Sequence, residues 1–152
     1  KKNAYNKSSK FKKYLDKENK KNLLDSATYN NFFKDCIKSK NTMINLLENI
    51  INEKKTICGY GATSKSTTIF NYCNIDSQYI QFITDTTSIK QNKLAPGMHI
   101  PIYDYDYFKN NLTDYCFLLA WNLKKEILEK EKNNFSTNGK WITHIPTAQI
   151  IK

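Results

Sequence analysis

Arginine is absent from the sequence, and all 24 basic residues are lysine. Recognition of base edges and phosphates most often uses the planar fork of arginine. Residues 1–21 carry a net charge of +7, so that the remaining residues carry only +3 of the total of +10. The lysines and the 19 asparagines are typical of a Lys/Asn-biased genome. We therefore expect no nucleic acid partner.

Long apolar runs and clustered cysteines are lacking as well. No window approaches the roughly eighteen apolar residues of a membrane-spanning helix, so we expect a cytoplasmic protein with no membrane partner.

Zinc sites need ligands that are close in sequence, and neither histidine lies near a cysteine. We expect no bound metal and four buried free thiols, at Cys36, Cys58, Cys73 and Cys116.

Glycine is scarce, with four in 152 residues, and two of the four lie within three positions of each other. Gly59 and Gly61 fall between the apolar run TIC and the helical pattern SKSTTIFNYC. Glycine allows a backbone to turn tightly and another group to approach it closely. The pair therefore indicates either a tight turn alone or a turn that a ligand approaches.

The first part of the chain differs from the rest. Residues 1–25 are polar and lysine-rich without a sustained period, which predicts an unfolded or loosely docked arm or linker. From residue 26 onward, apolar residues recur at three- and four-residue spacing over about 25 positions. This pattern predicts a long amphipathic helix capped by Ser26 or Thr28, at the start of one domain over residues 26–152.

Strand and helix patterns alternate after this helix. Strands are expected at residues 56–60, 78–85, 99–104, 114–121, 140–146 and 148–152, and helices at 64–73, 105–111 and 122–135, the last capped by Asn122. The alternation predicts an α/β fold: a Rossmann-like, doubly wound, mostly parallel sheet with flanking helices, preceded by a long N-terminal helix.

Ligands of such sheets bind at the carboxyl ends of the strands, where the segment GYGATSK lies. Its backbone N–H groups and the positive end of the following helix suit a phosphate. Lys65 would add a charge and Ser64 a hydroxyl. The alternative, that the glycines only permit the turn and Ser64 only caps the helix, stays open.

NAD is a second ligand that this turn suggests. The dinucleotide fingerprint G-x-G-x-x-G requires glycine at the position of Ser64, so the match is partial. Asp85, at the end of the second expected strand, lies in the region where an acidic residue binds a ribose. An NAD-binding domain of an oxidoreductase or regulator is therefore kept as an alternative.

Two further loops are candidates for binding. Residues 85–101 are read as an irregular binding loop with a turn at Pro96 and Gly97, in which His99 either contacts a ligand or is structural. Trp121 would cover the crevice or a ligand ring, and Asn122 either caps its helix or contacts the ligand. No nucleophile elbow, P-loop or metalloprotease motif is present, so we expect no self-sufficient catalyst.

Four segments follow one another in the order GYGATSK, DTTSIKQNKLAPGMHIPI, DYCFLLAWN and GKWITHIP. Together they resemble the C-terminal domain of nucleotide-sugar C-methyltransferases, from about residue 29 to the end of the chain. Complete members of that family have a zinc-binding N-terminal domain, a central S-adenosylmethionine-binding domain and a Rossmann-like C-terminal domain. The resemblance implies a nucleotide-sugar ligand, held between the last two domains.

In that family, a base of the central domain removes the proton beside the 4-keto group, and the enolate attacks the methyl group of S-adenosylmethionine. The resemblance implies that residues 59–65 face the pyrophosphate, with Asp85, Lys90 and His99 near the nucleotide or sugar. The expected ligand is a dTDP-4-keto-deoxysugar. The predicted substrate-binding residues are Gly59, Tyr60, Gly61, Ala62, Thr63, Ser64, Lys65, Asp85, Lys90, Pro96, Gly97, His99, Trp121 and Asn122.

The chain departs from the family pattern in what it lacks. All four glycines are assigned to turns, so no loop for S-adenosylmethionine is present, and the zinc cysteines are missing. We expect an isolated C-terminal domain that binds no cofactor and is inactive alone. The full-length protein would supply S-adenosylmethionine and zinc, and the missing S-adenosylmethionine-binding domain of the same polypeptide would be the partner.

The turn at Asn92 and a possible protein-interaction role remain to be considered. Asn92 stands where the family has a glycine, and asparagine tolerates the left-handed conformation that such a turn needs. A protein-interaction module, in which the arm and the long helix dock another protein, is the third functional hypothesis.

Overall fold

The structure is a computed structural model that describes residues 8–137 and 139–151. The chain divides into two compact units, residues 1–38 and 39–152. The first seven residues of the predicted arm lie outside the described residues. The division at residue 25 into an arm and a domain stays a prediction.

Helix formation begins earlier than the sequence pattern predicts. Helix α1, Ser9–Lys20, occupies much of the segment expected to be an unfolded or loosely docked arm, and none of its residues is buried. Its N-cap is Ser8, whose hydroxyl accepts a hydrogen bond from the backbone N–H of Phe11 at 3.2 Å. The missed helix has lysines in its last turn, where the negative end of the helix dipole stabilises positive charge.

The long helix α2, Ser26–Asn52, is confirmed. Its cap is neither Ser26 nor Thr28: the Asp25 carboxylate accepts a hydrogen bond from the backbone N–H of Ala27 at 2.9 Å. Its buried residues, Met43, Leu47 and Ile50, follow a three- and four-residue spacing and belong to the second unit.

The second unit contains one sheet of seven strands in the order β3-β4-β2-β1-β5-β6-β7. The strands are β1 Ile57–Tyr60, β2 Ile83–Thr84, β3 Lys93–Leu94, β4 Pro101–Tyr103, β5 Tyr115–Leu118, β6 Lys140–Thr143 and β7 Gln149–Ile151. The five central strands pair in parallel, whereas β3 and β7 are antiparallel to their neighbours. The chain runs outward from β1 through β2 to β4 and then returns to β5, which confirms the doubly wound topology.

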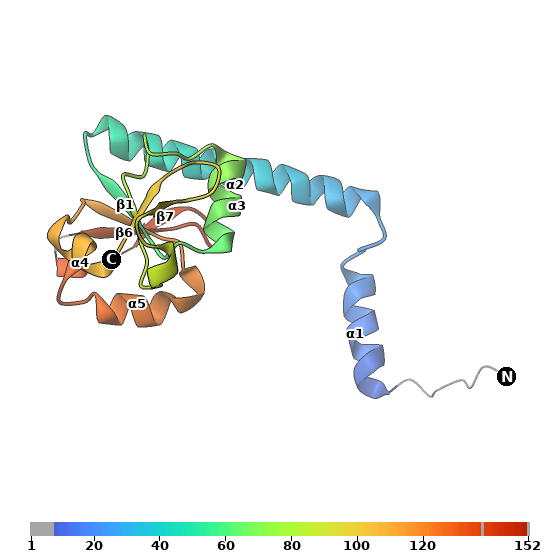
Figure 1. Ribbon diagram of the computed structural model, residues 1–152. Helices are drawn as coiled ribbons and strands as arrows, with labels where there is room; N and C mark the ends of the chain where they lie inside the picture. Colours follow the sequence, from blue (N-terminus) through green and yellow to red (C-terminus); the bar gives the residue numbers. More distant parts are fainter. Residues whose placement is uncertain (1–7, 138, 152) are drawn as a thin grey trace. The chain divides into compact units, whose positions relative to one another are not determined.

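Helices cover both faces of the sheet (Figure 1). The C-terminal part of α2 and α3, Ser64–Cys73, pack on one face, where Phe70 and Phe117 meet. On the other face α4, Tyr105–Asn110, and α5, Lys124–Lys130, pack on a core that includes Phe108 and Trp141. All four residues of β1 and of β5 are buried, as expected for central parallel strands.

Several local expectations differ from the structure. The second expected strand, residues 78–85, is a strand only over β2, although the Gln81 N–H still bonds to the Ile57 carbonyl at 2.9 Å. The expected irregular loop 85–101 contains a 3₁₀ helix, Ser88–Lys90, and the edge strand β3. Asn92 adopts φ +57°, which confirms the left-handed turn predicted there.

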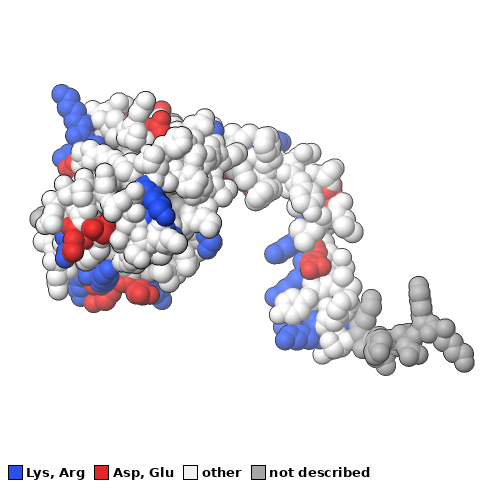
Figure 2. Space-filling view, viewed as in Figure 1, with Lys and Arg blue, Asp and Glu red and all other residues white. Residues whose placement is uncertain are grey.

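The burial of the cysteines, the distribution of charge and the length of the helices were also predicted from the sequence. Cys58, Cys73 and Cys116 are buried free thiols, whereas Cys36 is half-buried, so the expectation of four buried thiols is wrong at one position. Lysine side chains gather on α1, while lysines and carboxylates are interspersed on the visible face of the second unit (Figure 2). Within residues 8–137 and 139–151, no helix is long and apolar enough to cross a membrane.

Candidate functional site

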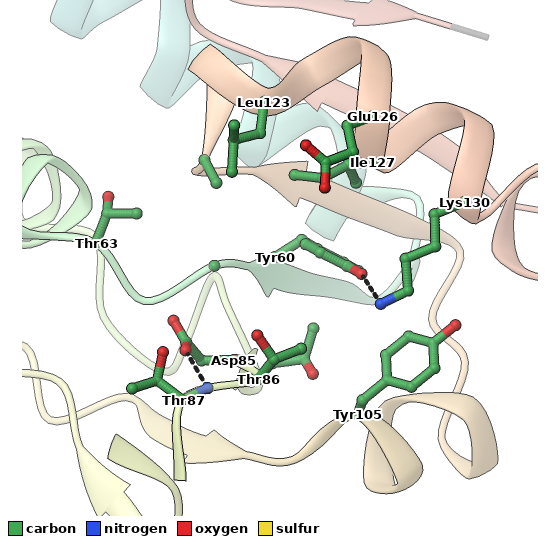
Figure 3. Close-up of a pocket in the computed structure, with 13 residues that line it drawn as sticks. Tyr60, Thr63, Asp85, Thr86, Thr87, Tyr105, Leu123, Glu126, Ile127 and Lys130 are labelled. Atoms are coloured by element: carbon green, nitrogen blue, oxygen red, sulfur yellow. Dashed lines mark hydrogen bonds between the residues drawn. The ribbon is translucent and has the colours of Figure 1, made fainter. Parts of the chain in front are cut away.

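A cleft of about 270 Å³ lies at the carboxyl ends of β1, β2 and β5 (Figure 3). This is the point where the winding of the sheet reverses, between β1 and β5, and ligands of doubly wound sheets bind at such points. Tyr60 and Gly61 come from β1 and its turn, Asp85 to Thr87 follow β2, and Leu123 to Lys130 come from the segment after β5. The position matches the crevice predicted from the sequence.

The glycine turn is shaped by the chain itself. Gly61 has φ +90°, and a Cβ added to it would lie 2.8 Å from the Cβ of Ala120, just after β5. A Cβ on Gly59 would meet the side chains of Leu119 and Ile83. The Gly59 and Gly61 N–H groups donate to the carbonyls of Phe82 and Thr84, at 2.8 Å each. Both glycines are therefore explained by the tight turn and its close packing.

Asp85 fastens this turn to the loop after β2. One carboxylate oxygen accepts from the Ala62 N–H at 2.8 Å and from the Lys90 ammonium at 3.1 Å, and the other accepts from the Thr87 N–H at 2.8 Å. Lys90 also donates to the Ala62 carbonyl at 2.8 Å. Burial opposes ionisation of Asp85, but hydrogen bonds from Thr87 and the Lys90 ammonium outweigh it and lower its pKa. Three donors of the chain use three of the about four acceptor sites of this carboxylate, which leaves little capacity for the ribose contact of the NAD alternative.

Helix α3 starts with a capping box. Thr63 is the N-cap; its hydroxyl accepts from the Ser66 N–H at 3.1 Å, and the Ser66 hydroxyl accepts from the Thr63 N–H at 3.0 Å. Among the described residues, the N–H groups of Ser64 and Lys65 have no acceptor. The Lys65 ammonium lies 5.0 Å from the ring centre of Trp121. Of the amides expected to bind an anion, those of residues 59 and 61–63 are thus occupied internally.

The opposite end of the cleft holds the predicted residue Tyr60 together with Tyr105, Lys130 and Glu131, which the sequence analysis missed. The Tyr60 hydroxyl donates to the fully buried Glu131 carboxylate at 2.8 Å, and the Tyr105 hydroxyl donates to it at 3.2 Å. The Lys130 ammonium donates to the Tyr60 hydroxyl at 3.3 Å. Burial and the hydrogen bond to Glu131 raise the pKa of Tyr60, so its hydroxyl stays protonated. We call Tyr60, Tyr105, Lys130 and Glu131 the lysine corner.

A signal for this corner exists in the sequence. Leu123, Glu126, Ile127 and Lys130 recur at three- and four-residue spacing directly after the strand at which the winding reverses. That spacing places them on one helix face, and all four line the cleft. The sequence analysis predicts only a helix for this segment, because nothing in the spacing distinguishes a cleft wall from a buried face.

The remaining predicted residues are divided between the cleft and other places. Pro96, with Ala62, Ser64 and Lys90, lines a second hollow of about 290 Å³ on the other side of the turn. Gly97 has φ +87° and packs against Asn71, whose amide donates to the Pro96 carbonyl at 2.9 Å. His99 is exposed and lines neither hollow.

The residues after β5 also differ from the sequence analysis. Trp121 and Asn122 lie in a 3₁₀ turn, Trp121–Leu123, that precedes α5. The N-cap of α5 is Leu123, with no side-chain hydrogen bond, so the assignment of Asn122 as a cap is wrong. Neither Trp121 nor Asn122 is among the residues that line the cleft.

The described residues offer neither an unengaged glycine loop nor a cluster of metal ligands. Gly97 and Gly139 pack against Asn71 and Phe135, and the other two glycines form the turn described above, so none remains for an S-adenosylmethionine loop. Within the described residues, no group of three or more His, Cys, Asp or Glu side chains is arranged to hold a metal ion. No chemical step through either cofactor is assigned to this chain.

Comparison with known proteins identifies a family. A family model described as the C-methyltransferase C-terminal domain matches residues 1–146. The C-methyltransferase NovU of Streptomyces niveus is 32% identical over 137 residues, which cover 90% of this chain and 33% of that protein. The chain thus spans about a third of the length of this relative. A seven-stranded, doubly wound sheet and a match over nearly its whole length show that the chain belongs to the C-methyltransferase C-terminal domain family.

Proposed function

We propose that this chain is the nucleotide-sugar-binding part of an S-adenosylmethionine-dependent sugar C-methyltransferase. The observation that carries the proposal is the cleft at the carboxyl ends of β1, β2 and β5, in a chain of this family. Its walls combine the Thr86 and Thr87 side chains, a carboxylate at Glu126 and an ammonium at Lys130. Hydroxyl groups and charges of both signs suit a ligand with a phosphate and several sugar hydroxyls.

In this proposal the chain binds and orients its ligand but does not carry out the reaction. The tyrosines at the cleft have raised pKa values, and Asp85 is occupied by three donors, so these three side chains do not act as the base. The methyl donor and the base would come from the remaining part of the polypeptide. The ligand would be a nucleoside-diphosphate sugar, with dTDP-4-keto-deoxysugars as the first class to test.

Isothermal titration calorimetry with dTDP tests the proposal. The wild-type chain should bind dTDP, and Leu123→Trp should weaken the affinity about tenfold or more because the indole fills part of the cleft. Leu112→Trp is the matched control: Leu112 and Leu123 are 48% and 46% exposed, but Leu112 lies before β5, away from the cleft. We expect no change for the control.

Two results with the wild-type chain would contradict the proposal, and one result with the variants would as well. Absence of dTDP binding at millimolar concentration is one of them. Saturable binding of NADH, followed by fluorescence, without a response to dTDP is the other, and it would favour the dinucleotide alternative despite the internal bonds of Asp85. Equal loss in both tryptophan variants would place the binding outside the cleft.

A further inference from the structure

The charges along the cleft are unevenly placed. Asp85 is paired with Lys90 at 3.1 Å, so its charge is neutralised within the chain. Glu126 is exposed on α5. Among the described residues that line the cleft, Lys130 is the one cationic side chain. An anionic group bound in this cleft therefore has one ammonium within the wall to pair with.

Lys130 retains binding capacity. It forms no ion pair within the described residues, and its ammonium donates one hydrogen bond, to the Tyr60 hydroxyl. An ammonium has three donors, so two remain. Figure 3 shows the Lys130 side chain extending from α5 toward Tyr60, with Tyr105 beside it at one end of the cleft.

The surroundings of Lys130 hold the ammonium in place. It lies 3.9 Å from the ring centre of Tyr105, a cation–π distance. Glu131 is fully buried and accepts from Tyr60, from Tyr105 and from the Asn134 amide at 3.0 Å, which fixes both tyrosines. An ammonium that is already positioned loses less conformational entropy when it binds a ligand.

The other two lysines that the sequence placed at the ligand are differently engaged. Lys65 lies over Trp121 and does not line the cleft, and Lys90 is bonded to Asp85 and to the Ala62 carbonyl. We propose that Lys130, held by Tyr60 and Tyr105, is the residue that binds the diphosphate of the ligand. This assignment rests on the proposed function and moves the phosphate contact from the glycine turn to α5.

Calorimetry with dTDP and with thymidine tests the assignment on the full chain. Lys130→Gln should lower the dTDP affinity about 10- to 100-fold, the effect of losing a charge-assisted hydrogen bond, and change thymidine binding less than about twofold. Lys130→Arg keeps the charge and should retain most of the dTDP affinity. Lys125→Gln is the matched control, because Lys125 is exposed on the same helix and does not line the cleft.

The outcomes separate this assignment from the proposed function. Failure of the wild-type chain to bind dTDP overturns both. Binding that survives in Lys130→Gln, or a loss confined to Lys65→Gln, overturns the Lys130 assignment and leaves the cleft as the binding site. A loss of dTDP and thymidine binding together in Lys130→Gln would show a general disturbance of the cleft and also overturns the assignment. Thermal unfolding of each variant confirms that it is folded.

Discussion

The two ends of the cleft differ in how their polar groups are used. At the glycine turn, Asp85 binds Lys90, Thr63 and Ser66 of the capping box bind each other, and the amides of residues 59 and 61–63 are occupied. At the lysine corner, the buried Glu131 is satisfied by its neighbours, and Lys130 in front of it keeps two donors. At the conspicuous motif most polar groups are used internally, and among the described residues only the Ser64 and Lys65 N–H groups of that segment are without an acceptor. At the end without a motif, a charged side chain keeps free donors.

This difference shows that a glycine-rich turn can be required by the fold alone or by contact with a ligand. Glycine identifies where the backbone must turn tightly or pass close to another segment, and at Gly61 that segment is Ala120 of the same chain. A ligand contact needs a further condition, namely donors or acceptors that the fold does not use itself. Mutations at each end therefore probe different properties: stability at the turn and ligand affinity at the corner.

The largest effect on stability is expected for Gly61→Ala. The new Cβ would meet Ala120 at 2.8 Å, in a backbone conformation at φ +90° that L residues rarely adopt. We expect a loss of about 3 kcal/mol in the free energy of unfolding, measured by urea denaturation. The double variant with Ala120→Gly should recover about 1 kcal/mol, because it removes the contact but not the backbone strain. Unchanged stability with lost dTDP binding would instead show that the turn faces the ligand.

A smaller effect, which depends on pH, is expected from His144. Unlike Glu131, this histidine is buried without a hydrogen-bond partner for either ring nitrogen among the described residues; its ring packs edge-on against Phe117. Burial lowers its pKa from 6.5 to about 4. The unfolded chain therefore takes up the proton first, so stability is fully present above pH 6.5 and falls as the pH drops toward 4.

Urea midpoints at pH 8 and pH 5 measure this effect. The wild-type chain should lose about 2 kcal/mol over this interval through His144. His144→Leu removes the titrating group and should flatten the profile, whereas His99→Gln should not, because His99 is exposed. An equal slope in wild type and His144→Leu would contradict the prediction.

The smallest effect is expected for Tyr105→Phe. The variant removes one of the hydrogen bonds to the buried Glu131 carboxylate but keeps the ring beside Lys130. We expect a loss of about 1 kcal/mol in unfolding free energy. Tyr107→Phe on the same helix is the control, since within the described residues the Tyr107 hydroxyl has no hydrogen-bond partner. A loss of similar size in both variants would assign the effect to ring packing rather than to Glu131.

The architecture was predictable because it depends on local patterns. Hydrophobic runs and turn residues located β1, β5 and α3, and their alternation predicted the parallel order of the central strands. The edge strand β3 was missed because it has two residues, and α1 because its pattern is dominated by lysine. The position of the cleft followed from the general rule for the ends of parallel strands.

The lysine corner was not predictable to the same degree. Tyr60 and Glu131 are 71 positions apart, and their hydrogen bond depends on how α5 packs over the end of β1. The hydrogen bonds of Asp85 were not predictable for the same reason, because its partners, Ala62 and Lys90, come from two different loops. Periodicity identifies a face of a helix, but only packing decides whether that face meets a core or a cleft.

The short edge strands of the sheet affect how readily two molecules can pair through their sheets. Its outermost described strands, β3 and β7, comprise two and three residues and run against their neighbours. A strand of another molecule that paired with either edge strand could form only a few backbone hydrogen bonds, which is too few for a stable intermolecular sheet. Concentrated solutions of this domain should therefore resist aggregation by edge-to-edge strand pairing, even when the helices are partly unfolded.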